Sequence, residues 1–282
     1  MATFTNQATL SYNGVATNSN VVVGEILEVL TVTKNALVDS YAANGDVTYV
    51  ISIVNSGAAA FSNLTVTDDL GAYADGNLTQ VPLTYIDGSL KYYVNGVLQA
   101  APAVTAGPPL TVGGISVPAG GNAVIIYEAQ VNGFAPLAAG SSIVNEAAVS
   151  GAGITQVSAE ETVTVREGAE LSVLKALSPL SVPENGQVTY TFTITNNGNT
   201  AVEAGSDIVL SDVFDPPITI TSVTFDGTPW TSPANYTYDQ QTGEFATVAG
   251  QITVPAATYT QNSAGEWVAE PGVSTLVIVG NV

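Results

Sequence analysis

Stretches in which apolar and polar residues alternate run along most of the chain, and Gly, Pro, Asn and Asp interrupt them. Within residues 30–36, Leu30 and Val32 share one face, and residues 46–55 continue the alternation. A period of two residues predicts β-strands with one buried face. No segment combines a period of 3.6 residues with good helix formers over three turns, so the pattern predicts an all-β fold.

Asn-Gly and Asp-Gly pairs separate many of these stretches and are strong short-range signals of hairpin turns. They occur at residues 13–14, 44–45, 87–88, 95–96, 132–133, 185–186 and 226–227. We favour turns over binding loops at these positions. Short strands joined by tight turns are typical of β-sandwiches.

The pattern repeats once within the chain, which predicts two domains of the same kind. Three pairs of segments correspond: 30–57 with 171–198, 63–70 with 207–214, and 123–131 with 274–282. The first pair aligns without a gap at a constant offset of 141 positions. We therefore predict a first immunoglobulin-like or Cna-B-like β-sandwich over 26–153, a linker over 154–164, and a second sandwich over 165–282.

The first repeat continues into an alternating stretch over 141–153, for which the second repeat has no counterpart at its own end. The matching sequence lies at the start of the chain, where residues 2–14 align with 141–153. The pairs are Phe4 with Ile143, Asn6 with Asn145, Ala8 with Ala147, and Leu10 with Val149. We predict a donor strand at 1–12 and a linker at 13–25.

A sandwich that lacks its final strand exposes a sheet edge and an apolar groove. We expect residues 2–12 of one molecule to complete the second repeat of another molecule by donor-strand complementation. Because donor and acceptor lie at opposite ends, the contact is heterologous and propagates into a filament. Two alternatives remain open at this point: closure of the second repeat by its own chain, and a tail without a partner.

The charge and composition exclude several functional classes. The net charge is −20, from 24 acidic and four basic residues, and such a surface repels nucleic acid and anionic lipid. The absence of Cys and His excludes thiolate catalysis, Ser-His-Asp catalysis and the usual zinc ligand sets. We expect no metal, no cofactor and no enzymatic activity on a diffusible substrate, and a hydrolase is the interpretation that we favour least.

The first residues, Met-Ala-Thr-Phe-Thr-Asn, show neither a basic region nor an apolar core, so no signal peptide is predicted. No run of about 18 apolar residues predicts a membrane span. An exported mature chain, and release by lysis of the producing cell, are both compatible with these features.

The strand motifs resemble the DUF11 conserved repeat of bacterial surface proteins. The resemblance rests on LTVTK, GDVTYVISIVNSG, NLTVTDDL and IVNEAAVS in the first repeat, and on LSVLK, GQVTYTFTITNNG and IVLSDVF in the second. It covers about two thirds of the chain and implies a sandwich on a bacterial cell surface or spore surface. Proteins of this family also occur in endospore appendages.

Each repeat places polar residues on the inward face of its strands. Lys34 and Asp68 do so in the first repeat with Asn145, and Lys175 and Asp212 do so in the second with Asn6 of the donor strand. Burying such groups without partners costs several kcal/mol each. One interpretation is a satisfied polar cluster in which a Lys–Asp pair lies beside an Asn.

The alternative follows from a resemblance to Cna-B-type sandwiches, whose Lys, Asn and acid form an intramolecular isopeptide bond. The resemblance implies a bond between Lys34 and Asn145 within one chain, and a bond between Lys175 and Asn6 of the neighbouring subunit. Asp68 and Asp212 would be the acids of this autocatalytic reaction. Asp69 is another candidate acid, but its alternation directs it outward.

Together these features predict a structural subunit of an extracellular fibre, whose partners are other copies of itself, with anchoring and tip partners unidentified. The competing interpretation is a surface adhesin or glycan-binding module in which the sandwiches are spacers. Four aromatic residues of the variable segment 222–270 would then form a carbohydrate platform: Trp230, Tyr236, Tyr238 and Trp267. We favour packing in the core and at its rim for these side chains.

Overall fold

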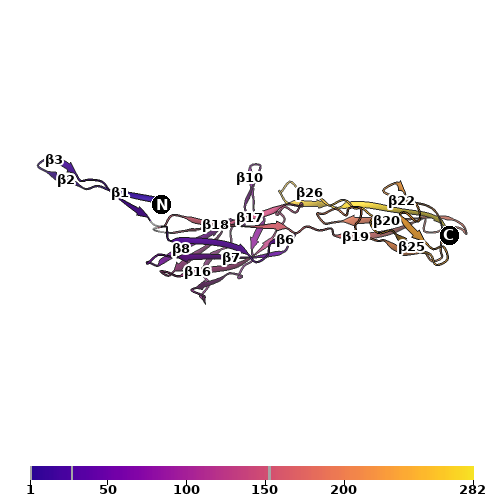
Figure 1. The fold of residues 1–282 in the computed structure, drawn as a ribbon, viewed down its shortest axis with the longest axis horizontal. Helices are drawn as coiled ribbons and strands as arrows, with labels where there is room; N and C mark the ends of the chain where they lie inside the picture. Colours follow the sequence, from indigo (N-terminus) through magenta and orange to yellow (C-terminus); the bar gives the residue numbers. More distant parts are fainter. Residues whose placement is uncertain (1, 27, 152–153) are drawn as a thin grey trace. The chain divides into compact units, whose positions relative to one another are not determined.

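The computed structural model describes residues 2–26, 28–151 and 154–282 (Figure 1). Every regular element in these ranges is a β-strand, which confirms the predicted all-β class. The described residues contain no helix with the length and apolar character needed to cross a membrane. The chain divides into two compact units, Met1–Asn132 with Ile143–Val163, and Gly133–Ser142 with Thr164–Val282.

Unit one contains two facing β-sheets. In order across the sheet, the first has β13 (Val97–Leu98), β12 (Lys91–Val94), β16 (Asn122–Val131), β7 (Asp46–Asn55) and β5 (Leu30–Ala36), with β11 (Leu83–Tyr85) also paired to β16. The second has β14 (Ala103–Thr105), β15 (Leu110–Val117), β8 (Phe61–Asp68), β17 (Ser142–Ser150), β18 (Val157–Val165) and β6 (Ser40–Tyr41). A separate small hairpin joins β9 (Tyr73–Asp75) and β10 (Leu78–Gln80).

The core of unit one follows from the alternation along its central strands. In β7, Tyr49, Ile51 and Ile53 are buried, and the residues between them are only partly covered. Leu64 and Val66 on β8 and the inward residues of β17 are also buried. Burial of such side chains stabilises a fold by about 1.5–3 kcal/mol each.

Unit two repeats this arrangement with fewer strands. Its larger sheet has the order β19 (Leu171–Ser178), β20 (Gln187–Asn196), β28 (Gly272–Asn281), β22 (Thr219–Phe225) and β23 (Thr228–Pro229). Its smaller sheet has the order β21 (Ser211–Val213), β25 (Glu244–Thr247) and β24 (Tyr236–Tyr238), and β26 (Thr258–Gln261) pairs with β27 (Trp267–Glu270).

Equivalent hydrogen bonds show that the two units share one plan. The Asn55 side chain donates to the carbonyls of Ala59 and Pro118, at 2.8 and 2.9 Å. Asn196 donates in the same way to Thr200 and Pro255, at 2.8 and 3.0 Å. In each unit the Asn Oδ1 also accepts from the backbone N–H two residues later, at 2.9 Å. The sequence alignment therefore corresponds to a structural alignment.

The units differ in the sheet that contains β8 in unit one and β21 in unit two. In unit one, β17 and β18 lie between β8 and β6. In unit two, the counterpart of β8 is β21, whose sheet partner among the described residues is β25 alone. Unit two therefore has no counterpart of β17 or β18 within the ranges that the structure describes.

The start of the chain forms a hairpin, which differs from the predicted linker over 13–25. β1 (Ala2–Asn6) pairs with β4 (Val22–Ile26), and β2 (Thr9–Tyr12) pairs with β3 (Val15–Asn18). Asn13 and Gly14 form the turn, and both have positive φ, 48° and 78°. A two-residue turn in which both residues have positive φ matches the right-handed twist of the strands on either side. We call residues 2–26 the N-terminal hairpin.

The predicted linker over 154–164 also differs from the structure, because β18 occupies most of it. Val163 and Val165 on β18 are buried, and the strand hydrogen-bonds to both β17 and β6. These apolar side chains gain more from burial in the sandwich than from exposure in a linker. The connection to unit two is therefore short, over residues 166–170.

Candidate functional site

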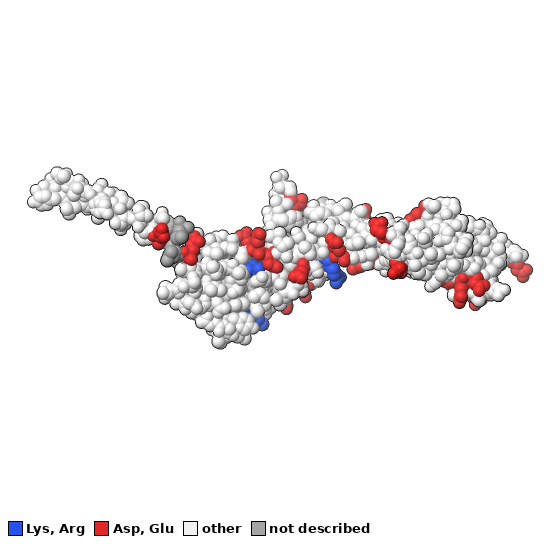
Figure 2. Space-filling view, in the orientation of Figure 1, with Lys and Arg blue, Asp and Glu red and all other residues white. Residues whose placement is uncertain are grey.

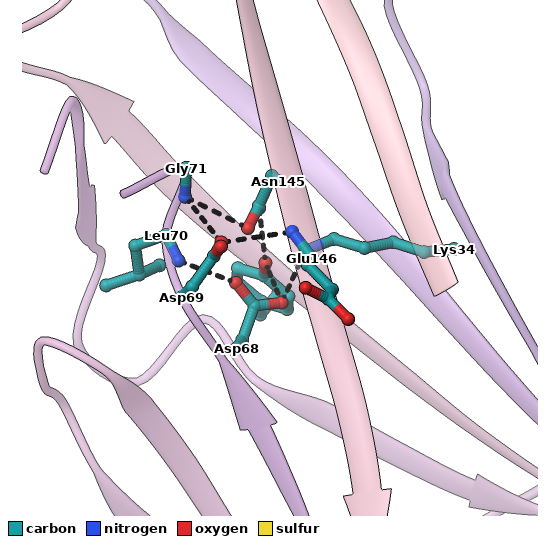
Figure 3. Close-up of polar contacts among 8 residues, drawn as sticks. Lys34, Asp68, Asp69, Leu70, Gly71, Asn145 and Glu146 are labelled. Carbon is teal, nitrogen blue, oxygen red and sulfur yellow. Dashed lines mark hydrogen bonds and ion pairs between the residues drawn. The ribbon is translucent and has the colours of Figure 1, made fainter. Parts of the chain in front are cut away.

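The predicted Lys34 and Asp68 meet in the core of unit one. Lys34 lies on β5 and Asp68 at the end of β8, and their Nζ and Oδ2 atoms are 2.6 Å apart. Both side chains are essentially without solvent contact, 0% and 1% exposed. Figure 3 shows Lys34 reaching toward Asp68 across the space between the two sheets.

Further donors converge on the Asp68 carboxylate. The Tyr127 hydroxyl donates to Oδ2 at 2.7 Å, and the Leu70 backbone N–H donates to Oδ1 at 3.1 Å. The Lys34 Nζ also lies 4.9 Å from the centroid of the Tyr49 ring. Because several donors reach the carboxylate, its burial cost is largely offset.

Asn145 joins the same network through a tyrosine. Its Nδ2 donates to the Tyr127 hydroxyl at 3.1 Å, and its Oδ1 accepts from the Gly71 backbone N–H at 3.1 Å. The pairing of β17 with β8 places Ala147 opposite Asp68 and so sets the position of Asn145. The three residues predicted for unit one therefore lie in one buried cluster, which we call the Lys34 cluster.

Burial changes the ionisation of several groups in this cluster. Desolvation lowers the pKa of Lys34, although Asp68 partly opposes the effect. Desolvation raises the pKa of Tyr49 and of Tyr127, and Asn145 acts in the opposite direction on both. The pKa of Tyr41 is also raised by burial.

We expect unit one to lose stability as the pH rises above 10, the ordinary pKa of tyrosine. Above that pH the unfolded chain releases the protons of Tyr41, Tyr49 and Tyr127, whereas the folded chain retains them, so unfolding becomes more favourable. The lowered pKa of Lys34 has the opposite effect on stability, but it involves one group, whereas three tyrosines act in the destabilising direction. Denaturant unfolding between pH 8 and about 11 measures the trend, and a stability that stays constant or rises would contradict it.

Asp69 has a separate structural role. Its Oδ1 accepts from the backbone N–H of Gly71 at 2.9 Å and of Glu146 at 3.0 Å, as Figure 3 shows. These bonds hold the turn after β8 against β17. Burial raises the pKa of Asp69, and its hydrogen bonds to the backbone act in the opposite direction. Asp68, the predicted acid, is the one that contacts Lys34.

Lys175 and Asp212 form the equivalent ion pair in unit two. The Lys175 Nζ lies over the rings of Tyr190, Phe192 and Phe214, at 4.8, 5.5 and 5.4 Å from their centroids. Here the lysine side chain is 39% exposed, against 0% for Lys34. The ion pair is therefore formed but only partly buried.

One residue of the Lys34 cluster has no equivalent in unit two. Tyr127 on β16 pairs with Tyr49, whereas the corresponding position on β28 is Ile278, which pairs with Tyr190. Tyr127 is not among the site residues predicted from the sequence. The difference between the two repeats at this inward position is the signal that could have identified it.

Two grooves flank β21 in unit two. One of about 340 Å³ is lined by apolar side chains that include Leu171, Val173 and Leu210. The other, of about 590 Å³, contains Asp212 and Phe245. Leu171 is 40% exposed, whereas its equivalent in unit one, Leu30, is 5% exposed. The face of β19 that corresponds to the covered face of β5 is thus open.

The predicted donor residues lie on the N-terminal hairpin with exposed side chains. Phe4 and Leu10 are 55% and 69% exposed, and Asn6 and Ala8 are also exposed. All four counterparts on β17 are at most 2% exposed: Ile143, Asn145, Ala147 and Val149. Asn6 is opposite Val22 on β4, and its predicted contact with Lys175 concerns two separate copies.

Three of the four aromatic residues considered for a carbohydrate platform pack against the core of unit two, as favoured above. Trp230 stacks on Phe225 with ring centroids 4.8 Å apart, and Tyr236 stacks on Phe245 at 5.2 Å. Tyr238 donates its hydroxyl to the Ile218 carbonyl at 2.7 Å. These contacts account for the three aromatic side chains by packing.

No protein-family model matches the chain, and no curated protein matches it. The resemblance to the DUF11 repeat therefore stays a prediction.

Among solved structures, the major pilin subunit BcpA of Bacillus cereus is 13% identical, with a TM-score of 0.37 over 96% of this chain and 73% of that one. The pilus backbone protein RrgB of Streptococcus pneumoniae is 14% identical, with a TM-score of 0.34 over 86% and 55%. The collagen-binding subdomain of the Enterococcus faecalis surface protein ACE is 6% identical, with a TM-score of 0.30 over 50% and 99%. All three of these TM-scores are below 0.5.

Proposed function

We propose that this chain is a structural subunit of an extracellular bacterial fibre, in which each copy completes unit two of the next by donating its N-terminal segment. The observation that carries the proposal is a pair of complementary features. Unit two has an open edge at β21 and exposed apolar residues on β19, and the N-terminal hairpin exposes the matching residues. In unit one, Leu30 on β5 and the four equivalents of the donor residues on β17 are buried.

The charge distribution supports contact between copies. Residues 2–24 contain no charged side chain, although the whole chain has a net charge of −20. Figure 2 shows a surface without acidic or basic residues over the hairpin up to its base, where Glu25 lies, whereas acidic residues are spread over the rest of the visible face. A neutral segment approaches an acidic partner without Coulomb repulsion, so two acidic copies can join there.

We also propose that the Lys34 cluster forms an isopeptide bond. Lys34 gives one proton to Asp68, which leaves a neutral amine, and burial favours this transfer because it lowers the pKa of the lysine. The Nζ atom then attacks Cγ of Asn145, and the Gly71 N–H stabilises the developing oxyanion on Oδ1. The dry core supplies the proximity that the reaction needs.

The atoms of this step balance without an oxidant or a cofactor. A bond forms between Lys34 Nζ and Asn145 Cγ, and the bond between Cγ and Nδ2 breaks. The proton lost by the attacking nitrogen reaches the leaving nitrogen through Asp68 and the Tyr127 hydroxyl, which contacts both groups. Ammonia leaves, and Asp68 remains protonated.

The same reaction between copies would make each subunit joint covalent. Lys175 and Asp212 of one copy are paired and uncovered, and Asn6 of the next copy is the equivalent of Asn145. Because Ile278 replaces Tyr127, proton transfer at the joint would pass directly between Asp212 and the amide. A covalent joint fails only by bond rupture, so the fibre would not depend on a dissociation rate.

Boiling in detergent tests the covalent joint. We expect the purified chain to give a ladder of bands, and peptide mapping of the ladder to find a branched peptide that joins Lys175 to Asn6. The variants Lys175→Arg and Asn6→Ala should abolish the ladder. Lys91→Arg, at an exposed lysine on β12, is the matched control and should retain it. Loss of one ammonia from the monomer reports the bond between Lys34 and Asn145.

Three outcomes separate the parts of this proposal. Filaments that dissolve to monomers in hot detergent would refute the covalent joint and leave non-covalent donation in place. A peptide that joins Lys175 to Asn6 in the monomer band would indicate closure by the same chain and refute the fibre. A chain that stays monomeric at high concentration, with no cross-link, would refute both.

A further inference from the structure

We infer that the donor is the whole N-terminal hairpin, and that its second strand inserts into unit two beside the first. This inference rests on the proposed function and specifies the partner surface. Donation by residues 2–12 alone would add one strand to β21. The topology of unit one has two strands, β17 and β18, for which the described residues of unit two show no counterpart.

The width of the vacancy comes from the strand order. In unit one, β17 and β18 both lie between β8 and β6, so three strand spacings separate β8 from β6. At about 4.8 Å per spacing, that distance is roughly 14 Å. One added strand would fill only the first position and leave a second sheet edge unpaired.

The far side of the vacancy is present in unit two. β6 corresponds to residues 181–182, and the turns that follow are equivalent in the two units. Gly45 N–H donates to the Ala42 carbonyl at 3.1 Å, and Gly186 N–H donates to the Pro183 carbonyl at 2.8 Å. Val182 packs against the core of unit two, yet residues 181–182 form no strand. β6 is a strand because β18 pairs with it, and in unit two that partner is missing.

The second strand of the hairpin has the residues that this position requires. Residues 20–34 align without a gap with 161–175, so Val22 corresponds to Val163, which is fully buried in unit one. Val22 itself is 55% exposed. Cross-strand pairing places Val22 on the same face as Asn6, so the inward residues of both strands share one face.

The hairpin also compensates for one change of side-chain volume. In unit one, Ile143 and Val165 are both buried, and their counterparts are Phe4 and Gly24. Phe4 is directly opposite Gly24, and a Cβ atom added to Gly24 would lie 2.3 Å from the Phe4 ring. The larger ring therefore uses the space that the glycine leaves, which requires the two strands to act as one unit.

The short connection to β5 indicates a second copy as the acceptor. Residues 27–29 separate β4 from β5 and span at most about 10 Å. They align with 168–170, which lie between β18 and β19. In unit one, β17 and β18 complete the sandwich that precedes the connection to β19. If the connection to β5 follows the same rule, the N-terminal hairpin completes a sandwich that precedes it, which is unit two of another copy. Each joint between copies then repeats the joint within a copy.

Two glutamate variants on adjacent residues of β4 test the inference in the full chain. Val22 and Val23 are both exposed, 55% and 67%, so both variants should fold normally. Val22 corresponds to buried Val163, and Val23 corresponds to exposed Thr164. We expect Val22→Glu to weaken assembly at least about tenfold, because a carboxylate would be buried without a partner. Val23→Glu should assemble like the unmodified chain.

Sedimentation and electron microscopy measure filament formation by these two variants and by Ala8→Glu, a third variant on the first strand of the hairpin. Loss of filaments in Val22→Glu and Ala8→Glu, with normal filaments in Val23→Glu, would support the two-strand donor. Loss in Ala8→Glu alone would overturn it and leave donation by a single strand. If the unmodified chain and all three variants stay monomeric, the proposed function fails with it.

Discussion

Deletion of residues 2–26 should convert an assembling protein into a soluble monomer, which is the largest effect that we expect from any single change. The deleted segment supplies every predicted donor residue, and its strands pair with one another and with no strand of unit two. Both units should therefore keep their folds while the joint between copies is lost. Size-exclusion chromatography and circular dichroism of the truncated chain measure the two effects.

A peptide of residues 2–26 added in trans provides the control. It should bind the truncated chain once per copy and raise the stability of unit two by about 2.7 kcal/mol at a concentration one hundred times its dissociation constant. A peptide with Ala8→Asp and Leu10→Asp should not bind, because both positions would face the groove in the proposed joint. Filaments formed by the truncated chain would contradict the assembly mechanism.

In a chain that has not formed the proposed cross-link, Lys34→Ala should lower the free energy of unfolding of unit one by about 3–5 kcal/mol, because it leaves the buried Asp68 carboxylate without its cationic partner. A change of this size lowers the Tm of a domain of this length by roughly 10 °C. Lys34→Met should cost less when it is combined with Asp68→Leu, since no charge then remains buried. Calorimetry that resolves the two units is the measurement.

Lys175→Ala is the matched control in unit two of the monomer. The equivalent pair there is partly exposed, so its loss should cost less than about 1 kcal/mol. The contrast between two equivalent lysines therefore reports how well each unit is covered. Equal losses of stability in the two variants would contradict the difference in burial on which the open acceptor depends.

Sequence alternation alone predicts much of the fold. The inward positions of β7 and β8, the internal repeat and the Asn-Gly turns are local properties of the chain, and they predict the strands that the structure has. The same alternation places Lys34, Asp68 and Asn145 inward, and the structure brings them into one network. A period of two residues specifies which face a side chain occupies, because successive Cβ atoms point to opposite sides of a strand.

Tertiary structure decides which strands are neighbours, and this choice is not local. The Asn13-Gly14 turn predicts a hairpin, but the alternation cannot show that residues 15–26 return along the first strand and belong to the donor. Nor can it show that β17 and β18 separate β8 from β6, or that Tyr127 connects Asp68 with Asn145. These relations depend on contacts between segments far apart in the chain. Local patterns of residues specify the strands, the repeat and the inward polar side chains. The pairing of distant strands sets the width of the open edge and the membership of the buried network, because hydrogen bonds between strands join residues that no local pattern relates.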